Sequence, residues 1–200
     1  MPRSPQPPTR RERDKQAKLE RITAAASELF ARHGVDEVTT QQIAEAADIG
    51  TGTLFLYARS KGDLLLLVQN AHYARALEEG RARAAHTSTA LHGVMALVEQ
   101  VVRCNRAHVD NGRTYLREVV FGDTRQPHRA EALSIVSRTE QAVTEILADR
   151  SSLTAEQART AARIVSAILV LELGTDPAAD RSISDLLTSI RTQVAALLPA

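Results

Sequence analysis

The spacing of apolar residues predicts helices along almost the whole chain. Over about residues 14–33, apolar side chains recur at intervals of three and four positions, which places them on one face of a helix. These side chains are Leu19, Ile22, Ala26, Leu29 and Phe30. Gly34 follows them as a residue suited to end the helix. Valine and isoleucine elsewhere also follow helical rather than alternating spacing, so the pattern predicts an all-α fold.

Residues 39–61 have a different pattern, with two short apolar clusters separated by a turn. Thr39 is a capping residue ahead of the first cluster. Asp48 stands where the chain must turn, and aspartate tolerates left-handed backbone better than most residues. Gly50 and Gly52 then allow another backbone to approach closely. Two short helices joined in this way form a helix-turn-helix, whose second helix lies in the major groove of DNA.

A longer helix is expected from Lys61 to about Ala85. Ser60 is a capping residue, Asp63 adds an acidic group three positions later, and a run of leucines follows. The first turn of this helix adjoins the helix-turn-helix, and its later turns adjoin the rest of the chain. We therefore expect it to act as a covalent lever between two domains.

The remaining sequence predicts five more helices, each opened by a cap or a turn. The pair Asn111-Gly112 is expected to end the first of them, and Thr154 with Gln157 forms a capping box before the fourth. The predicted ranges are about residues 90–110, 113–121, 128–149, 155–173 and 183–197, which gives about nine helices in total.

The last two helices have more apolar surface than an exposed helix needs. Residues 164–173 are apolar nearly all the way round, so this segment requires cover on two faces. We predict a symmetric dimer interface in which two helices from each subunit form a four-helix bundle. The alternative is that both helices belong to the core of one chain. The interface residues expected are Ile164, Ile168, Leu171, Leu187, Ile190 and Val194.

Composition changes this picture at the N-terminus. The net charge of the 200 residues is only +1, but residues 1–13 combine four prolines with four arginines and almost no apolar content. We expect this segment to be disordered. It is either a solvated tail or a basic arm that reaches a minor groove or nearby phosphates.

Cysteine content and apolar runs bear on the compartment. Cys104 is the single cysteine, which excludes an internal disulfide and a cysteine-rich zinc site and fits a reducing cytoplasm. No apolar segment of the kind found in secretory signals follows Met1, and the longest apolar run is too short to span a bilayer. We expect a soluble cytoplasmic protein with no membrane partner.

An enzyme is the main competing class, and the sequence disfavours it. The six histidines include no HExxH motif and no other close pair on one helix face, so no metal site is expected. The chain has no glycine-rich phosphate loop and no recognisable nucleophile motif. We therefore expect no catalytic residues and no cofactor.

Residues 15–65 resemble the DNA-binding domain of TetR-family transcriptional regulators. The matching segments are ELFARHG at 28–34, TTxxIA at 39–44, GTLxxY at 52–57 and the Ser-Lys pair at 60–61. The resemblance implies a three-helix DNA-binding domain at 14–62 and a larger helical domain at 63–200 for ligand binding and dimerisation.

The resemblance also implies a function. It implies a homodimer that binds a roughly palindromic DNA operator, most often as a repressor, and that a small molecule releases. The alternatives are an activator, or an accessory DNA-binding protein without ligand control.

The same resemblance implies which residues contact DNA. Threonine hydroxyls, Tyr57 and Lys61 would hold phosphates, and Gln41 would reach a phosphate or a base edge. The chain departs from the family in having Gly50-Thr51 where a Ser-Lys pair is common, so Arg59 is a candidate replacement contact. The full set is Thr39, Thr40, Gln41, Thr51, Gly52, Thr53, Phe55, Tyr57, Arg59 and Lys61.

Candidate effector-binding residues are polar or aromatic groups within the apolar helices of the second domain. They are Cys104, His108, Tyr115, Glu118, Phe121 and Glu172. The competing interpretation makes Cys104 an ordinary buried thiol, His108 a capping residue and Glu172 a solvated group. Because aromatic residues are scarce, a pocket would be lined mainly by Leu, Val and Ala, which favours a moderately apolar small molecule.

Overall fold

A computed structural model describes residues 9–175 and 181–199. Within these residues the chain forms nine helices and no strand, which confirms the all-α prediction. The helices are α1 (Arg10–Glu37), α2 (Thr40–Ala46), α3 (Thr51–Leu54), α4 (Lys61–Ala84), α5 (Ala90–Arg106), α6 (Val109–Phe121), α7 (Pro127–Arg150), α8 (Ala155–Gly174) and α9 (Ile183–Ala195). None of the described helices is both long and apolar enough to cross a membrane.

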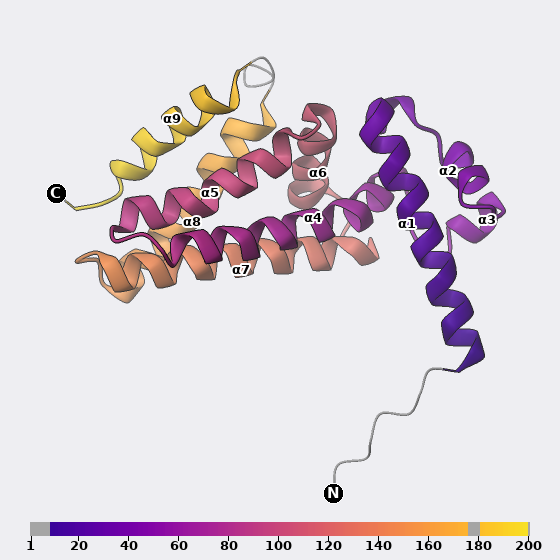
Figure 1. The fold of residues 1–200 in the computed structure, drawn as a ribbon, viewed down its shortest axis with the longest axis horizontal. Coiled ribbons are helices and arrows are strands. Elements are labelled where there is room, and N and C mark those ends of the chain that lie inside the picture. The colour runs from indigo at the N-terminus through magenta and orange to yellow at the C-terminus, as the bar shows by residue number, and fades with distance from the viewer. Residues whose placement is uncertain (1–8, 176–180, 200) are drawn as a thin grey trace, which may run out of the picture.

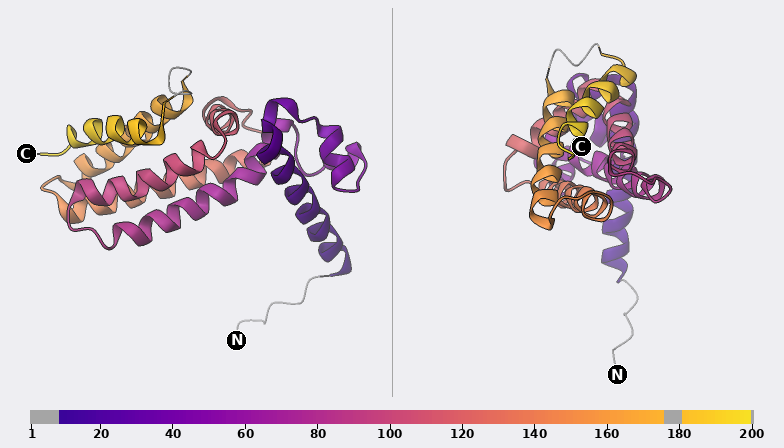
Figure 2. Two further views of the ribbon diagram at one scale, coloured as in Figure 1. Left: turned by 45° about the horizontal axis from the view of Figure 1, so that its top comes forward. Right: turned by 90° about the vertical axis from the view of Figure 1, so that its left-hand side faces the viewer.

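The helices form two bodies joined by α4 (Figure 1). The helices α1, α2 and α3 pack at one end (Figure 2). The helices α5 and α7 lie along the later turns of α4, and α8 and α9 pack on them to complete an elongated bundle. The shorter α6 stands crosswise between the bundle and α1. The helices α2 and α3 therefore lie at the end of the molecule opposite the C-terminal half of α9 (Figure 1).

The first turns of α4 belong to the core of the N-terminal body. Leu64, Leu65 and Leu66 are completely buried, and they cluster with Phe30 of α1 and Leu54 of α3. The later turns of α4 contribute to a second cluster, formed largely by α5, α7, α8 and α9. One continuous helix thus enters both cores, as expected for a lever between the domains.

The helix α1 begins earlier than the sequence analysis predicted. Thr9 caps it, its hydroxyl accepts a hydrogen bond from the backbone N–H of Glu12, and the Glu12 carboxylate accepts one from the Thr9 N–H in return. This capping box places residues 10–13 in a helix, so the prediction of disorder is wrong for them. Residues 1–8 of the predicted arm lie outside the described residues.

Asn111 and Gly112 do not end a helix, contrary to prediction. The break falls at residues 107–108, and both residues lie inside α6. The Asn111 amide accepts from the Val35 N–H at 2.7 Å and donates to the Phe30 carbonyl at 2.8 Å. A Cβ on Gly112 would lie 2.2 Å from the Asn105 carbonyl oxygen, so only glycine allows this approach. The pair serves packing between helices rather than a turn.

The predicted dimer residues divide into core and surface. Ile190 and Val194 of α9 are 0% and 1% exposed within one chain, and Ile168 of α8 is also buried. Their assignment to the interface is therefore wrong, because they are already covered by the chain's own helices. Ile164 and Leu171 remain 40% and 65% exposed on α8, and Leu187 is half-buried against the core.

Candidate nucleic-acid interface

Residues 39–61, called the reading segment, contain α2, α3 and the turn between them. This turn has the geometry that its sequence predicts. Thr39 caps α2 through a capping box with Gln42, and its hydroxyl is hydrogen-bonded within that box. Asp48 adopts a φ of 53°, and its carboxylate pairs with Arg21 of α1 at 3.2 Å. Thr39 is therefore a structural cap in this conformation, which leaves Thr40 and Gln41 as the more available polar groups at the start of α2.

Residues 50–56, which include α3, bury the apolar side chain of Leu54 and leave the outer side of α3 uncovered by the rest of the chain. Leu54 is completely buried against the N-terminal core. A Cβ on Gly50 or on Gly52 would meet no atom within 4 Å, and neither residue has a positive φ. The fold of this chain therefore does not require glycine at these positions, and their small size leaves space for a partner to approach.

Two large apolar side chains project from the same segment. Phe55, which was predicted to contact DNA, is 46% exposed, and Leu56, which was not, is 83% exposed. Solvent exposure of a leucine beside a reading helix has no packing explanation within the chain. The signal in the sequence was an apolar residue immediately after Leu54 and Phe55, where a helix with one buried face should present a polar side chain.

Tyr57 and Lys61 are held by backbone carbonyls of α1. The Tyr57 hydroxyl donates to the carbonyl of Lys15 at 3.4 Å, and the Lys61 ammonium donates to the carbonyl of Asp36 at 3.0 Å. Both partners are near the surface, so phosphate oxygens could replace them at little cost. Gln41 similarly donates to the exposed carboxylate of Glu45 at 2.9 Å. These side chains are positioned at the surface before any DNA is bound.

The first turns of α1 add positive charge next to this surface. The N-terminal turns of α1 contain five basic residues, and all five are exposed: Arg10, Arg11, Arg13, Lys15 and Lys18. Because the Tyr57 hydroxyl reaches the Lys15 carbonyl, these turns lie beside the reading segment. Cations at such positions neutralise phosphates and release counterions on binding. The basic element that the sequence predicted as an arm is, from Arg10 onward, a helix.

The reading surface is joined to the second domain by buried hydrogen bonds. Asp63 of α4 is completely buried, and its carboxylate accepts from the backbone N–H groups of Arg59 and His128, at 2.9 and 3.2 Å. The His128 ring donates from Nε2 to the Tyr57 carbonyl at 2.9 Å. The Gln126 amide donates to the Ser60 hydroxyl at 3.2 Å. The start of α7 is thereby fixed to the end of the reading segment.

Three predicted effector residues instead have structural partners. The Tyr115 ring stacks on Tyr73 with centroids 4.2 Å apart, and burial raises the pKa of both phenols. The Glu118 carboxylate packs over Gly62 and accepts from Gln126 at 3.3 Å. Burial alone would raise the pKa of Glu172, but hydrogen bonds from Ser189, Arg181 and Gln193 lower it.

Phe121, a fourth residue of the predicted set, is 82% exposed at the end of α6 and does not line the cavity between α5 and α9, the one between α1, α4 and α5, or the one between α1 and α2. Cys104 and His108 line the cavity between α1, α4 and α5, which has a volume of about 380 Å³.

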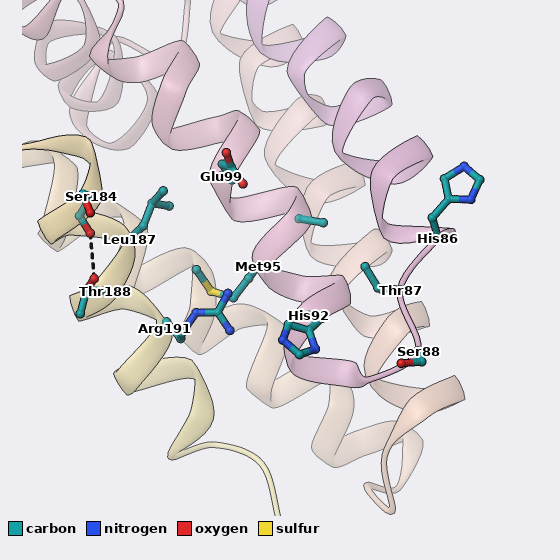
Figure 3. Close-up of a pocket in the computed structure, with 11 residues that line it drawn as sticks. His86, Thr87, Ser88, His92, Met95, Glu99, Ser184, Leu187, Thr188 and Arg191 are labelled. Atoms are coloured by element: carbon teal, nitrogen blue, oxygen red, sulfur yellow. Dashed lines mark hydrogen bonds between the residues drawn. The ribbon is translucent and has the colours of Figure 1, made fainter.

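A second cavity, of about 500 Å³, opens between the start of α5 and α9 (Figure 3). Its lining includes His92, Glu99 and Arg191, while His86 points away from α9. The described part of the chain brings together no group of three side chains suited to hold a metal ion. The Nδ1 of His92 is already hydrogen-bonded to the Thr89 hydroxyl at 2.8 Å.

Comparison with known proteins agrees with this architecture. Residues 22–68 match the family described as bacterial regulatory proteins, tetR family. No curated protein matches the chain in sequence. A TetR transcriptional regulator from Rhodococcus sp. RHA1 is similar in structure, with a TM-score of 0.72 at 17% identity over 92% of this chain and 96% of that one.

Two FadR structures are also similar. FadR of Thermus thermophilus, a TetR-family repressor solved with lauroyl-CoA, has a TM-score of 0.69 at 21% identity, covering 91% of this chain and 95% of its own. FadR of Bacillus subtilis, solved with stearoyl-CoA, has a TM-score of 0.61 at 16% identity, covering 90% and 99%. The likeness at these identities concerns the fold.

Proposed function

We propose that this chain, which is a TetR-family transcriptional regulator, is a repressor that binds a roughly palindromic operator as a homodimer and releases it when a small molecule binds. The observation that carries the proposal is the exposed reading segment with its buried link to the second domain. Residues 50–61 present open, positioned side chains, while Asp63 and His128 tie the same segment to α7. A reading surface built in this way can respond to movements of the other domain.

The exposed face of α8 supports a dimer. Ile164 and Leu171 lie seven residues apart, about two turns, so they share a face of α8 that this chain leaves uncovered. A two-fold dimer would bury this face against its own copy. It would also set the separation of two reading segments, which must match half-sites about 34–36 Å apart or a multiple of that distance.

Release by a ligand follows from the same geometry. A molecule that favours another separation of the reading segments would shift the population away from the DNA-binding conformer. The two FadR structures contain acyl-CoA ligands, which is consistent with a small-molecule effector for this fold. An activator, or a regulator without an effector, would use the same reading surface.

Selection from a random DNA pool tests the proposal most directly. We expect the full chain to enrich a roughly palindromic duplex, with an affinity that falls steeply as salt rises. Lys61→Ala should weaken binding to enriched and scrambled duplexes by a similar factor, since it contacts phosphate. Arg191→Ala, a loss of positive charge on α9, is the matched control and should leave binding unchanged. Enrichment of no sequence, or an isotherm independent of salt, would refute the proposal.

A further inference from the structure

The cavity between the two domains is walled on one side by the DNA-binding domain itself. Phe30 and Ala31 of α1 face Val68 and Ala76 of α4 across a volume of about 380 Å³. Cys104 and Ala107, from α5 and the break that follows it, complete the apolar lining. The rest of the lining is polar or charged, so the wall is mixed, and the volume falls within the usual range of small-molecule sites.

The charged groups around this cavity are predominantly positive. Arg75 and Arg103 line it, with Glu79 as the one carboxylate in the lining. Arg75 pairs with Glu79 at 3.7 Å, and Arg103 pairs with Glu99, outside the lining, at 2.8 Å. Burial and the charge of Arg75 lower the pKa of His72, another lining residue. Within the lining itself, an anion would meet two guanidinium groups and one carboxylate, and both guanidinium groups already have carboxylate partners.

Two side chains in the lining, those of Gln100 and His108, each have a buried polar atom without a hydrogen-bond partner among the described residues. Gln100 is only 6% exposed, and its Nε2 has no hydrogen-bond partner among the described residues. A buried donor without an acceptor costs about 1–3 kcal/mol, so such groups usually have a reason to persist. Gln100 lines the cavity, and this N–H is itself buried, so it would bond an occupant of the cavity only after the terminal amide turned.

The cavity is also next to a contact that fixes α1 on α6. Asn111 lines the cavity and forms the two hydrogen bonds to Phe30 and Val35. His108 lines it as well, and its ring lies where a Cβ on Gly34 would fall, at 2.8 Å. Gly34 has a φ of 76°, so this contact sits at the point where α1 is broken. A molecule in the cavity would therefore contact the residues that hold α1 against α6 near Gly34.

We propose that this cavity binds a small aliphatic carboxylate, whose chain lies against Phe30 and Val68 and whose carboxylate accepts from Gln100 and the flanking arginines, and that its occupation weakens DNA binding. The regulatory half rests on the proposed function. The carboxylate supplies the acceptor that Gln100 lacks, and its charge complements Arg75 and Arg103. Because α1 forms one wall, occupation of the cavity changes the position of α1, and with it that of the reading segment, relative to α4 and α5.

Cys104 provides a built-in reporter for the test, since it is the single cysteine of the chain and lines the cavity. Burial raises the pKa of its thiol to about 11, so alkylation by N-ethylmaleimide is slow enough to follow by mass spectrometry. Octanoate at ten times its dissociation constant should slow alkylation about tenfold, because only unoccupied protein reacts. Octan-1-ol and octylamine, which lack the carboxylate, should protect Cys104 much less.

Two variants test the residues that carry the site. Gln100→Leu removes the buried donor by replacing the amide with an apolar side chain of similar size, and octanoate protection should be lost. Ala31→Phe fills the mouth from an exposed position on α1 and should abolish protection without threatening the fold. Gln141→Leu, the same change at an exposed site on α7, is the matched control and should retain full protection.

DNA binding is then measured with and without octanoate at constant ionic strength. The expected result is weaker operator binding by the parent chain and by Gln141→Leu, with no change for Gln100→Leu or Ala31→Phe. Equal protection by octan-1-ol, or protection that survives in Gln100→Leu, would overturn the site. Protection of Cys104 with unchanged operator binding would overturn the regulation alone. Protection without any specific DNA binding would support the site and refute the proposed function.

Discussion

The reading segment and the second domain treat polar side chains in opposite ways. In residues 39–61, Gln41 and Lys61 lie at the surface, where exposed groups or backbone carbonyls are their only partners. In the second domain, Tyr115 and Glu172 are enclosed in hydrogen bonds within the chain. A polar residue on a helix is therefore a candidate ligand contact only where other residues of the chain do not already enclose it in hydrogen bonds.

The same contrast applies to apolar side chains. Leu56 and Phe55 project into solvent at the reading end, and Leu171 does so on α8, while Ile190 is enclosed. Leu56 and Phe55 belong to the surface proposed to contact DNA, and Leu171 belongs to the face proposed to meet a second copy of the chain. Four tests of this division follow, ordered from the largest expected effect to the smallest.

Ile190 and Leu171 separate the core from the proposed interface. Ile190→Asp places an unpaired carboxylate in a fully buried position, and we expect a loss of about 4 kcal/mol in the free energy of unfolding. Leu171→Asp should leave the circular dichroism spectrum helical but convert a dimer into a monomer in sedimentation experiments. An Ile190→Asp chain as stable as the parent chain, or a dimeric Leu171→Asp chain, would contradict the assignment.

Asn111 tests the joint between the two domains. Asn111→Ala removes hydrogen bonds to Phe30 and Val35 and leaves two buried backbone groups unpaired, at a cost of about 2–3 kcal/mol. Urea denaturation measures the change. Gln16→Ala, on the exposed face of α1, is the control and should stay within about 0.5 kcal/mol. A similar small change for Asn111→Ala would mean that this joint does not hold the domains.

Leu56 tests whether the exposed apolar side chains read DNA. We expect one of its contacts to be a thymine methyl group, whose removal costs about 0.8 kcal/mol, or about fourfold in affinity. Replacing each operator thymine in turn by uracil measures this loss. Leu56→Ala should lose about as much affinity for the duplex that contains the thymine. Replacing that thymine by uracil should then cause no further loss of affinity in Leu56→Ala.

Leu133→Ala, an exposed leucine on α7, is the matched control for Leu56 and should bind both duplexes as the parent chain does. If uracil replacement at every position has the same effect on Leu56→Ala as on the parent chain, Leu56 does not contact a methyl group.

Glu172 gives the smallest effect, through pH. Its pKa is lowered below 4.5 in the folded chain, so the charged form favours folding. This contribution is fully present above pH 4.5 and is lost as the pH falls through the folded-state pKa. We expect the free energy of unfolding of the parent chain to fall more steeply below pH 4.5 than that of Glu172→Gln. Parallel pH curves for the two proteins would show that Glu172 does not stabilise the α8–α9 contact.

Local patterns predicted most of the reading segment correctly. The cap at Thr39, the positive φ of Asp48 and the helix start after Ser60 all depend on neighbours within about four residues. The cap at Thr9 has the same local form, with Glu12 three residues later, so the start of α1 was also readable from the sequence.

The errors concern residues whose partners are distant in sequence. Asn111 has the composition of a turn, but its amide pairs with Phe30 and Val35, about eighty residues earlier. Ile190 has the spacing of an interface residue, but it is fully buried within the chain's own second core. Nothing near either residue in the sequence distinguishes these outcomes.

By itself, the sequence determined the all-α class, the number of helices, most of their caps and the helix-turn-helix, because each depends on hydrogen bonds and apolar spacing within a few residues. Only the tertiary structure decided which polar groups stay available, which apolar faces stay uncovered and where a cavity remains between α1 and α5. Those properties depend on which distant segments bury a given side chain, and burial follows from the packing of whole helices.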